Sequence, residues 1–300
     1  MQEKMTDNGK GGALLILGAG LLWGTTGTAQ ALAPAGVNSV SLGTLRVAVG
    51  GLCLLIIAFS RGSFRGITSW PLLTTVIAAF FVAAYQLTFF AAVATTGVAV
   101  GTMVAIGSSP IAAGLLGYFV RQERLGLRWM TATALAVAGC SALAAGSGSL
   151  QVSFAGVLLA LGAGFAYAAY TVSVKSLLDT VREDAAIAVV FSVAALMMVP
   201  LLFFFEVKWA LEPRGMAVIL HLGLFSTALS YLLFAKGLKR VKVGTAATLS
   251  LAEPLTAALL GVVILGERLA TTQITGIMFI FSGIILLSMG SFGFRRVRKE

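Results

Sequence analysis

The sequence predicts an all-α polytopic membrane protein: ten transmembrane helices arranged as two five-helix repeats of inverted topology, with both termini in the cytoplasm. Three observations lead to this prediction. They are the apolar composition, the distribution of basic residues between alternate loops, and a phrase that occurs once in each half of the chain.

The composition indicates a chain that lies in a bilayer. Of the 300 residues, 58% are hydrophobic and 11% are charged, whereas a soluble domain carries about 25% charged residues. A helix needs about 20 apolar residues to cross the hydrocarbon core. Stretches of that length are predicted as spans at 11–32, 38–59, 71–93, 97–120, 126–146, 153–175, 185–205, 214–236, 244–266 and 270–290. The loops between them are too short to form a soluble domain.

The basic residues predict the orientation of these spans. With the N-terminus assigned to the cytoplasm, 17 of the 21 Lys and Arg residues fall in segments on that side and three fall on the other. This asymmetry follows the positive-inside rule and places both termini in the cytoplasm. The net charge of +10 is therefore a topology signal, and we expect no nucleic-acid partner. The expected partners are the lipid bilayer and a small solute, and the sequence is compatible with a monomer.

A repeated phrase predicts the internal symmetry. "PIAAGLLGYFVRQERL" begins at Pro110, "PLTAALLGVVILGERL" begins at Pro254, and eight of the sixteen positions match. Because the repeating unit contains five helices, an odd number, the second copy enters the membrane from the opposite side. We therefore expect inverted repeats at 1–148 and 149–300. Inverted repeats are typical of secondary transporters, whose binding site lies near the midplane between them.

The two repeated prolines are candidate hinges. Proline removes a backbone donor and clashes with the carbonyl four residues earlier, so Pro110 and Pro254 should each bend or weaken their helix. One interpretation is a static kink that assists packing, and the other is a hinge that is used in both halves during transport.

Two charged residues are predicted within spans. Glu253 and Arg46 are costly there, because a charge at the centre of a membrane helix costs about 2.5–3.5 kcal/mol on insertion scales. A structural interpretation has the Glu253 side chain form a hydrogen bond to the backbone that Pro254 loosens, or pair with Arg46. A functional interpretation gives Glu253 a substrate amine or a coupling proton.

Each copy of the phrase ends in a Glu-Arg pair, Glu123 with Arg124 and Glu267 with Arg268. Such pairs either terminate a helix with a local ion pair at the membrane interface or act as gating charges, and the sequence leaves both interpretations open.

Several motifs together resemble a known family. They are "LLWGTTG" in the first span, "LRVAVGGL" around Arg46, Pro110 with Glu123, "TALSYLLFAKGL" in the eighth span and "AEPLTAALLGVVILGERL" in the ninth. In this order the chain resembles the drug/metabolite transporter superfamily in its ten-helix EamA-type form, and within it the YddG-type aromatic amino-acid and metabolite exporters. The resemblance implies a central cavity lined largely by spans one to four and six to nine, with spans five and ten more peripheral.

Aromatic and polar residues on those spans are candidates for the cavity. Each is also explained by ordinary packing or by hydrogen bonding between helices. The candidates are Trp23, Thr26, Tyr85, Gln86, Phe89, Ser108, Tyr167, Tyr170, Ser230, Tyr231 and Glu253.

The low charge of this set favours a neutral or zwitterionic solute. We expect a secondary transporter of the bacterial inner membrane that exports amino acids, aromatic or hydrophobic ones above all, by alternating access. The alternatives are a drug/cation–proton antiporter or another metabolite carrier of the superfamily, and a channel-like facilitator from a different class. We expect no enzyme, cofactor or metal site, since the chain has one His, two separated Cys within spans and no carboxylate pair on one helix face.

Overall fold

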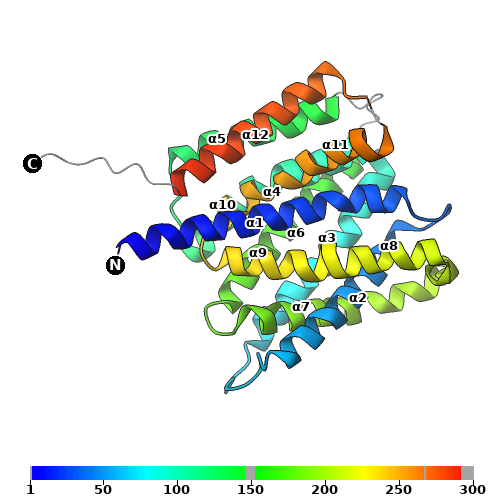
Figure 1. Cartoon of the computed structure of the whole chain (residues 1–300), viewed down its shortest axis with the longest axis horizontal. Coiled ribbons are helices and arrows are strands. Elements are labelled where there is room, and N and C mark those ends of the chain that lie inside the picture. Colours follow the sequence, from blue (N-terminus) through cyan, green and yellow to red (C-terminus); the bar gives the residue numbers. More distant parts are fainter. Residues whose placement is uncertain (1, 97, 146–152, 267, 292–300) are drawn as a thin grey trace, which may run out of the picture.

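The computed structural model describes residues 2–96, 98–145, 153–266 and 268–291, and all regular structure in these ranges is helical. The helices lie side by side in one bundle (Figure 1). They are α1 (Gln2–Ala31), α2 (Ser39–Ser60), α3 (Leu72–Thr96), α4 (Val98–Arg121), α5 (Leu127–Ala145), α6 (Phe154–Leu177), α7 (Glu183–Met198), η1 (Val199–Phe204), η2 (Lys208–Leu211), α8 (Pro213–Gly223), η3 (Leu224–Leu229), α9 (Ser230–Leu238), α10 (Val243–Leu249), α11 (Ala252–Leu265) and α12 (Thr271–Ser291).

Ten spans in the described ranges are long and apolar enough to cross a membrane. Their bounds agree with those predicted from the sequence to within three residues, which confirms the ten-span prediction. Seven spans are single α-helices. The other three consist of consecutive helical segments: α7 with η1, α8 with η3 and α9, and α10 with α11.

The bundle has two ends. Helix α1 begins and α12 ends at the same end (Figure 1), which we call the terminal face. The connections 61–71, 122–126, 178–182 and 239–242 also lie there, because consecutive spans run in opposite directions. The other end, which we call the distal face, holds the connections 32–38, 205–212 and 268–270.

Small residues let helices of the two halves of the chain pack closely. Helices α3 and α4 pack on α6, α2 packs on α7, α1 on α11 and α5 on α12. At the α5–α12 contact, a Cβ atom on Gly139 would lie 2.6 Å from the carbonyl oxygen of Gly276, so only glycine permits this approach. Without a hydrophobic driving force in lipid, close van der Waals packing of this kind stabilises membrane helices.

Two spans are irregular at mid-depth. The eighth contains the π-helical turn η3, and π-helical turns are often found at functional sites. The ninth is interrupted between Leu249 and Ala252, so Pro254 lies in the first turn of α11, where its missing N–H leaves no helical bond unmade. Helix α4 instead runs unbroken through Pro110. The two prolines match in sequence but differ in local structure.

Candidate functional site

A cavity of about 550 Å³ extends from mid-depth toward the distal face. Every span except the seventh contributes to its lining. The lining includes residues near the distal ends of their helices: Gln30, Ser39, Ala144 and Gln273. The aromatic part of the wall consists of Trp23, Tyr85, Phe89, Phe90, Tyr167 and Tyr231.

Most of the predicted cavity residues lie at this cavity. Those that line it are Trp23, Thr26, Tyr85, Gln86, Phe89, Tyr167, Tyr231 and Glu253, together with Arg46 and Pro254. Whether each of them contacts a substrate stays a prediction.

Three predicted residues, Ser108, Ser230 and Tyr170, are not among those that line this cavity. The hydroxyl of Ser108 donates to the carbonyl of Ala105 and faces Gly164 of α6. The fully buried hydroxyl of Ser230 donates to the carbonyls of Ser226 and Thr227, so it is satisfied within its own helix. Tyr170 packs between other aromatic rings below the cavity.

Spans five and ten are less peripheral than the resemblance implied. Cys140, Leu143 and Ala144 of α5 line the cavity, and so does Gln273 of α12. Phe90 and Thr102 also line the cavity. The sequence does not predict them as lining residues, because neither stands out from the apolar residues around it. The close packing of α5 on α12 holds both helices against the cavity.

Arg46 and Glu253 line the same cavity without forming an ion pair. In the described structure no nitrogen of Arg46 lies within 4.0 Å of a carboxylate oxygen, and its buried Nε has no hydrogen-bond partner. The Glu253 side chain has no hydrogen-bond or ion-pair partner among the described residues either, although its backbone N–H donates to the carbonyl of Ser250 over 2.9 Å. Direct pairing of Arg46 with Glu253, one of the two structural interpretations, is therefore not observed.

The break in the ninth span positions Glu253. Its carboxylate lies in the first turn of α11, where the partial positive charge of the helix N-terminus favours an anion. Helix α1 approaches this turn closely: a Cβ atom on Gly24 would lie 2.7 Å from the carbonyl oxygen of Glu253 and 2.5 Å from the Cβ of Thr256. Across the break, the hydroxyl groups of Tyr167 and Ser250 are hydrogen-bonded at 3.0 Å.

Packed aromatic rings form the floor of the cavity. The rings of Trp23 and Tyr231 have centroids 4.9 Å apart, and those of Trp23 and Phe234 are 5.3 Å apart. Below them Phe191 lies 4.3 Å from Tyr231. Phe191 and Phe234 are almost completely buried, so this floor separates the cavity from the terminal half of the bundle.

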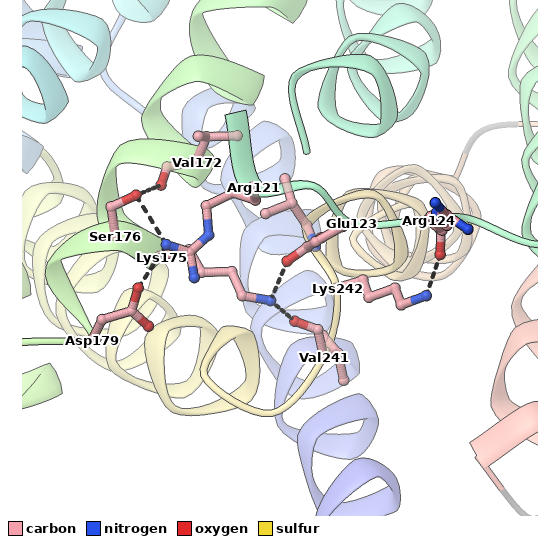
Figure 2. Close-up of polar contacts among 10 residues, drawn as sticks. Arg121, Glu123, Arg124, Val172, Lys175, Ser176, Asp179, Val241 and Lys242 are labelled. Atoms are coloured by element: carbon pink, nitrogen blue, oxygen red, sulfur yellow. Dashed lines mark hydrogen bonds and ion pairs between the residues drawn. The ribbon is translucent and has the colours of Figure 1, made fainter. Parts of the chain in front are cut away.

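Polar contacts join α6 to two connections at the terminal face (Figure 2). Lys175 of α6 forms an ion pair with Glu123 at 2.8 Å, and both side chains are only 12% exposed. The other carboxylate oxygen of Glu123 accepts the backbone N–H of Val243 over 2.7 Å, and Lys175 also donates to the carbonyl of Val241. We call Glu123, Lys175, Val241 and Val243 the Glu123 cluster.

Of the two Glu-Arg pairs, only Glu123 with Arg124 is fully described, and it does not form a local ion pair. Glu123 pairs with Lys175 rather than with Arg124, whose side chain is exposed and whose carbonyl accepts a bond from Lys242. Nearby, Arg121 forms a separate ion pair with Asp179 at 2.6 Å (Figure 2). Glu267 lies outside the described residues, and Arg268 is exposed, without an ion pair to any residue that the structure describes.

Comparison with known proteins decides the family. The profile of the EamA-like transporter family matches residues 10–145 and again residues 154–289. The chain belongs to the EamA-like transporter family. It is therefore a small-molecule transporter of the drug/metabolite transporter superfamily, embedded in a bacterial membrane by multiple spans, and not an enzyme. Within the described ranges, no three His, Cys, Asp or Glu side chains cluster as a metal site would require.

Relatives support this membership. The uncharacterized transporter YwfM of Bacillus subtilis is 44% identical over 92% of this chain and 93% of its own length. The uncharacterized inner membrane transporter YicL of Salmonella typhimurium is 26% identical over 93% of this chain and 96% of its own length. The threonine/homoserine exporter RhtA of Escherichia coli is 36% identical over 50% of this EamA-family chain and 48% of RhtA. One crystal structure superposes with a TM-score of 0.80 over 96% of this chain and 99% of its own chain. Because the sequence identity is only 23%, this similarity shows the fold alone.

Proposed function

We propose that the chain exports small neutral or zwitterionic metabolites, above all aromatic and hydrophobic amino acids, by alternating access. The cavity is the observation that carries this proposal. Its volume of about 550 Å³ falls in the range of small-molecule sites, its walls are mostly apolar and include six aromatic side chains, and it contains one cationic and one anionic side chain, Arg46 and Glu253. A solute with an apolar side chain and no net charge complements such a surface.

The proposal assigns the orientation from the basic residues. The terminal face carries the excess of Lys and Arg, so we place it in the cytoplasm. The cavity, which approaches the distal face, is then accessible from outside the cell, and the chain is in an outward-facing state.

We further propose inverted repeats at 1–148 and 149–300. The family profile matches once within each of these ranges, which supports two related halves. Two halves of opposite orientation give inward- and outward-facing states similar energies, and this permits alternating access around one site.

The cytoplasmic side is closed in this state by two layers. The aromatic floor lies below the cavity, and the Glu123 cluster joins α6 to the connections 122–126 and 239–242 at the terminal face. To face the cytoplasm, the transporter must separate Glu123 from Lys175 and Val243. We assign the accompanying bend to the break before Pro254 and to Pro110. Glu267 and Arg268 are the proposed gating charges of the opposite face.

A drug/cation–proton antiporter is a second candidate, which the unpaired carboxylate of Glu253 favours. Aromatic walls and a carboxylate attract organic cations. Arg46 in the same cavity opposes this candidate, because it repels a solute that carries only positive charge. The similarity to RhtA, a threonine/homoserine exporter, also supports the first candidate.

The test is transport by the purified protein in liposomes loaded with radiolabelled phenylalanine, tyrosine, leucine, threonine and homoserine. Tetraphenylphosphonium and a phosphorylated sugar complete the panel. We expect saturable efflux of one or more amino acids, fastest for those with aromatic or hydrophobic side chains. Preference for the phosphonium cation or the sugar phosphate over every amino acid would overturn the proposed substrate class.

A further inference from the structure

Arg46 and Glu253 are opposite charges on two helices that do not pack on each other at this depth, α2 and α11, with the cavity between them. We propose that they are the two poles of the substrate site: Arg46 binds the carboxylate of a free amino acid and Glu253 binds its ammonium group. The inference rests on the proposed function and deepens it, because it predicts that the site requires both charges on one solute.

The first step is that neither charged side chain has an ion-pair partner among the residues that the structure describes. Charged side chains within a membrane usually pair with each other or mark the path of a substrate. Here they do not pair, and the buried Nε of Arg46 has no acceptor among the described residues. Both side chains line the cavity, so their remaining partners must come from its contents.

The second step is chemical complementarity. The guanidinium group presents several N–H donors in a planar fork, which fits a carboxylate in bidentate geometry. The Glu253 carboxylate accepts the N–H donors of an ammonium group, and the N-terminus of α11 stabilises its negative charge. A free amino acid offers a carboxylate and an ammonium group on adjacent atoms, and it leaves both poles neutralised.

The third step concerns the side chain of the solute. Tyr85, Phe89 and Phe90 of α3 and Trp23 of α1 present aromatic surface to the same cavity. Tyr85 and Phe89 are stacked at 5.7 Å between centroids, which gives α3 a continuous aromatic face. A hydrophobic or aromatic side chain would lie against this wall while the charged groups are held at the poles.

The experiment compares three solutes that differ only in charge: phenylalanine, phenethylamine, which lacks the carboxylate, and 3-phenylpropionate, which lacks the amine. Each is measured for inhibition of radiolabelled phenylalanine counterflow in proteoliposomes. Each missing charge leaves one pole unpaired, so we expect the two analogues to inhibit at least about tenfold more weakly than phenylalanine. If wild-type protein transports phenylalanine but all three solutes inhibit equally, the two-pole site is wrong and the proposed function stands. If no amino acid is transported, the proposed function fails first.

Variants assign the poles. In Arg46→Gln, inhibition by phenylalanine should weaken at least about tenfold, whereas inhibition by phenethylamine, which has no carboxylate, should change by less than about threefold. In Glu253→Gln, inhibition by phenylalanine should weaken as much, whereas inhibition by 3-phenylpropionate, which has no amine, should change by less than about threefold. Arg65→Gln and Glu212→Gln are matched controls, since both residues are exposed and lie outside the cavity. Equal losses for all three solutes in both variants would indicate a purely structural role and overturn the assignment. If either variant does not fold, Arg46→Lys and Glu253→Asp, which keep the charges, take its place. Both must then rank the three solutes by inhibition in the same order as the wild-type protein does.

Discussion

Lys175 and Glu123 meet at 2.8 Å although 51 residues separate them in the chain, and they lie on the face opposite the cavity. Glu123 also accepts the N–H of Val243, so one carboxylate joins residues of both halves of the chain. In the proposed alternating-access cycle this interaction must break before the cavity can open at the terminal face, so we expect it to favour the state in which the cavity approaches the distal face.

The first prediction concerns this bias. Glu123→Gln keeps an acceptor for the N–H of Val243 but loses the ion pair with Lys175. If that loss destabilises the state with a closed terminal face by about 1.4 kcal/mol, the population of the state with an open terminal face should rise about tenfold. The opening is measured in a chain whose own two cysteines are replaced by alanine. Into this chain a cysteine is introduced at Ala247, which lines a small pocket together with Glu253. Its alkylation by a reagent on the terminal side should be faster in the variant.

Arg124→Gln is the control for that measurement. Arg124 is adjacent to Glu123 in sequence, but its side chain is exposed, so the alkylation rate should not change. Equal rates in the wild-type protein and in the Glu123 variant would contradict a role of the cluster in closure.

The second prediction concerns the prolines. Pro254→Ala restores an N–H that can bond to the carbonyl of Ser250 and continue the helix across the break, and Pro110→Ala restores an interior bond of α4. Both variants should fold with unchanged or higher thermal stability, and both should transport several-fold more slowly. Thermal unfolding and transport are measured on the same preparations. Unchanged transport in both variants would leave the prolines as static features.

The third prediction concerns the contact between α1 and α11. Gly24→Ala places a Cβ 2.5 Å from the Cβ of Thr256, so the helices must separate beside Glu253. We expect a stability loss of about 1–3 kcal/mol together with reduced transport. Gly9→Ala is the matched control, because a Cβ there meets nothing within 4 Å. A Gly24 variant as stable and active as the Gly9 variant would show that the close approach is not required.

The fourth prediction concerns α5. If this helix lines the working cavity, Leu143→Cys in the cysteine-free chain should react with a membrane-impermeant thiol reagent from the distal side, and a transported amino acid should slow the reaction. Leu127→Cys lies at the other end of the same helix and is exposed, so its labelling from the terminal side should not depend on substrate. Labelling at position 143 that is insensitive to every transported solute would place α5 outside the substrate path.

The spans were predictable because an apolar run of membrane length is a local property of the sequence. Cavity residues such as Tyr85 and Glu253 were predictable because aromatic and charged side chains are conspicuous at mid-depth. Ser230 and Ser108 show the limit of this reasoning, since a hydroxyl bonded to its own helix looks the same in sequence as one that faces a cavity.

The rest depends on three-dimensional packing. The partner of Glu123 comes from a distant helix, and no local pattern distinguishes Lys175 from Arg124 as that partner. Likewise the separation of Arg46 from Glu253 depends on how α2 and α11 lie around the cavity. The break at Ser250 also differs from the unbroken helix at Pro110, although the two phrases match in sequence.

Counterflow tests the central claim, a carrier with one site exposed alternately to the two sides, most directly. Proteoliposomes loaded with unlabelled phenylalanine, or with whichever amino acid the transport panel selects, are diluted into a trace of the same labelled solute. A carrier should accumulate the label transiently above its external concentration, and this accumulation should be saturable and disappear when the internal solute is omitted. Label that only equilibrates, at a rate proportional to concentration and unaffected by internal solute, would contradict it and indicate a channel.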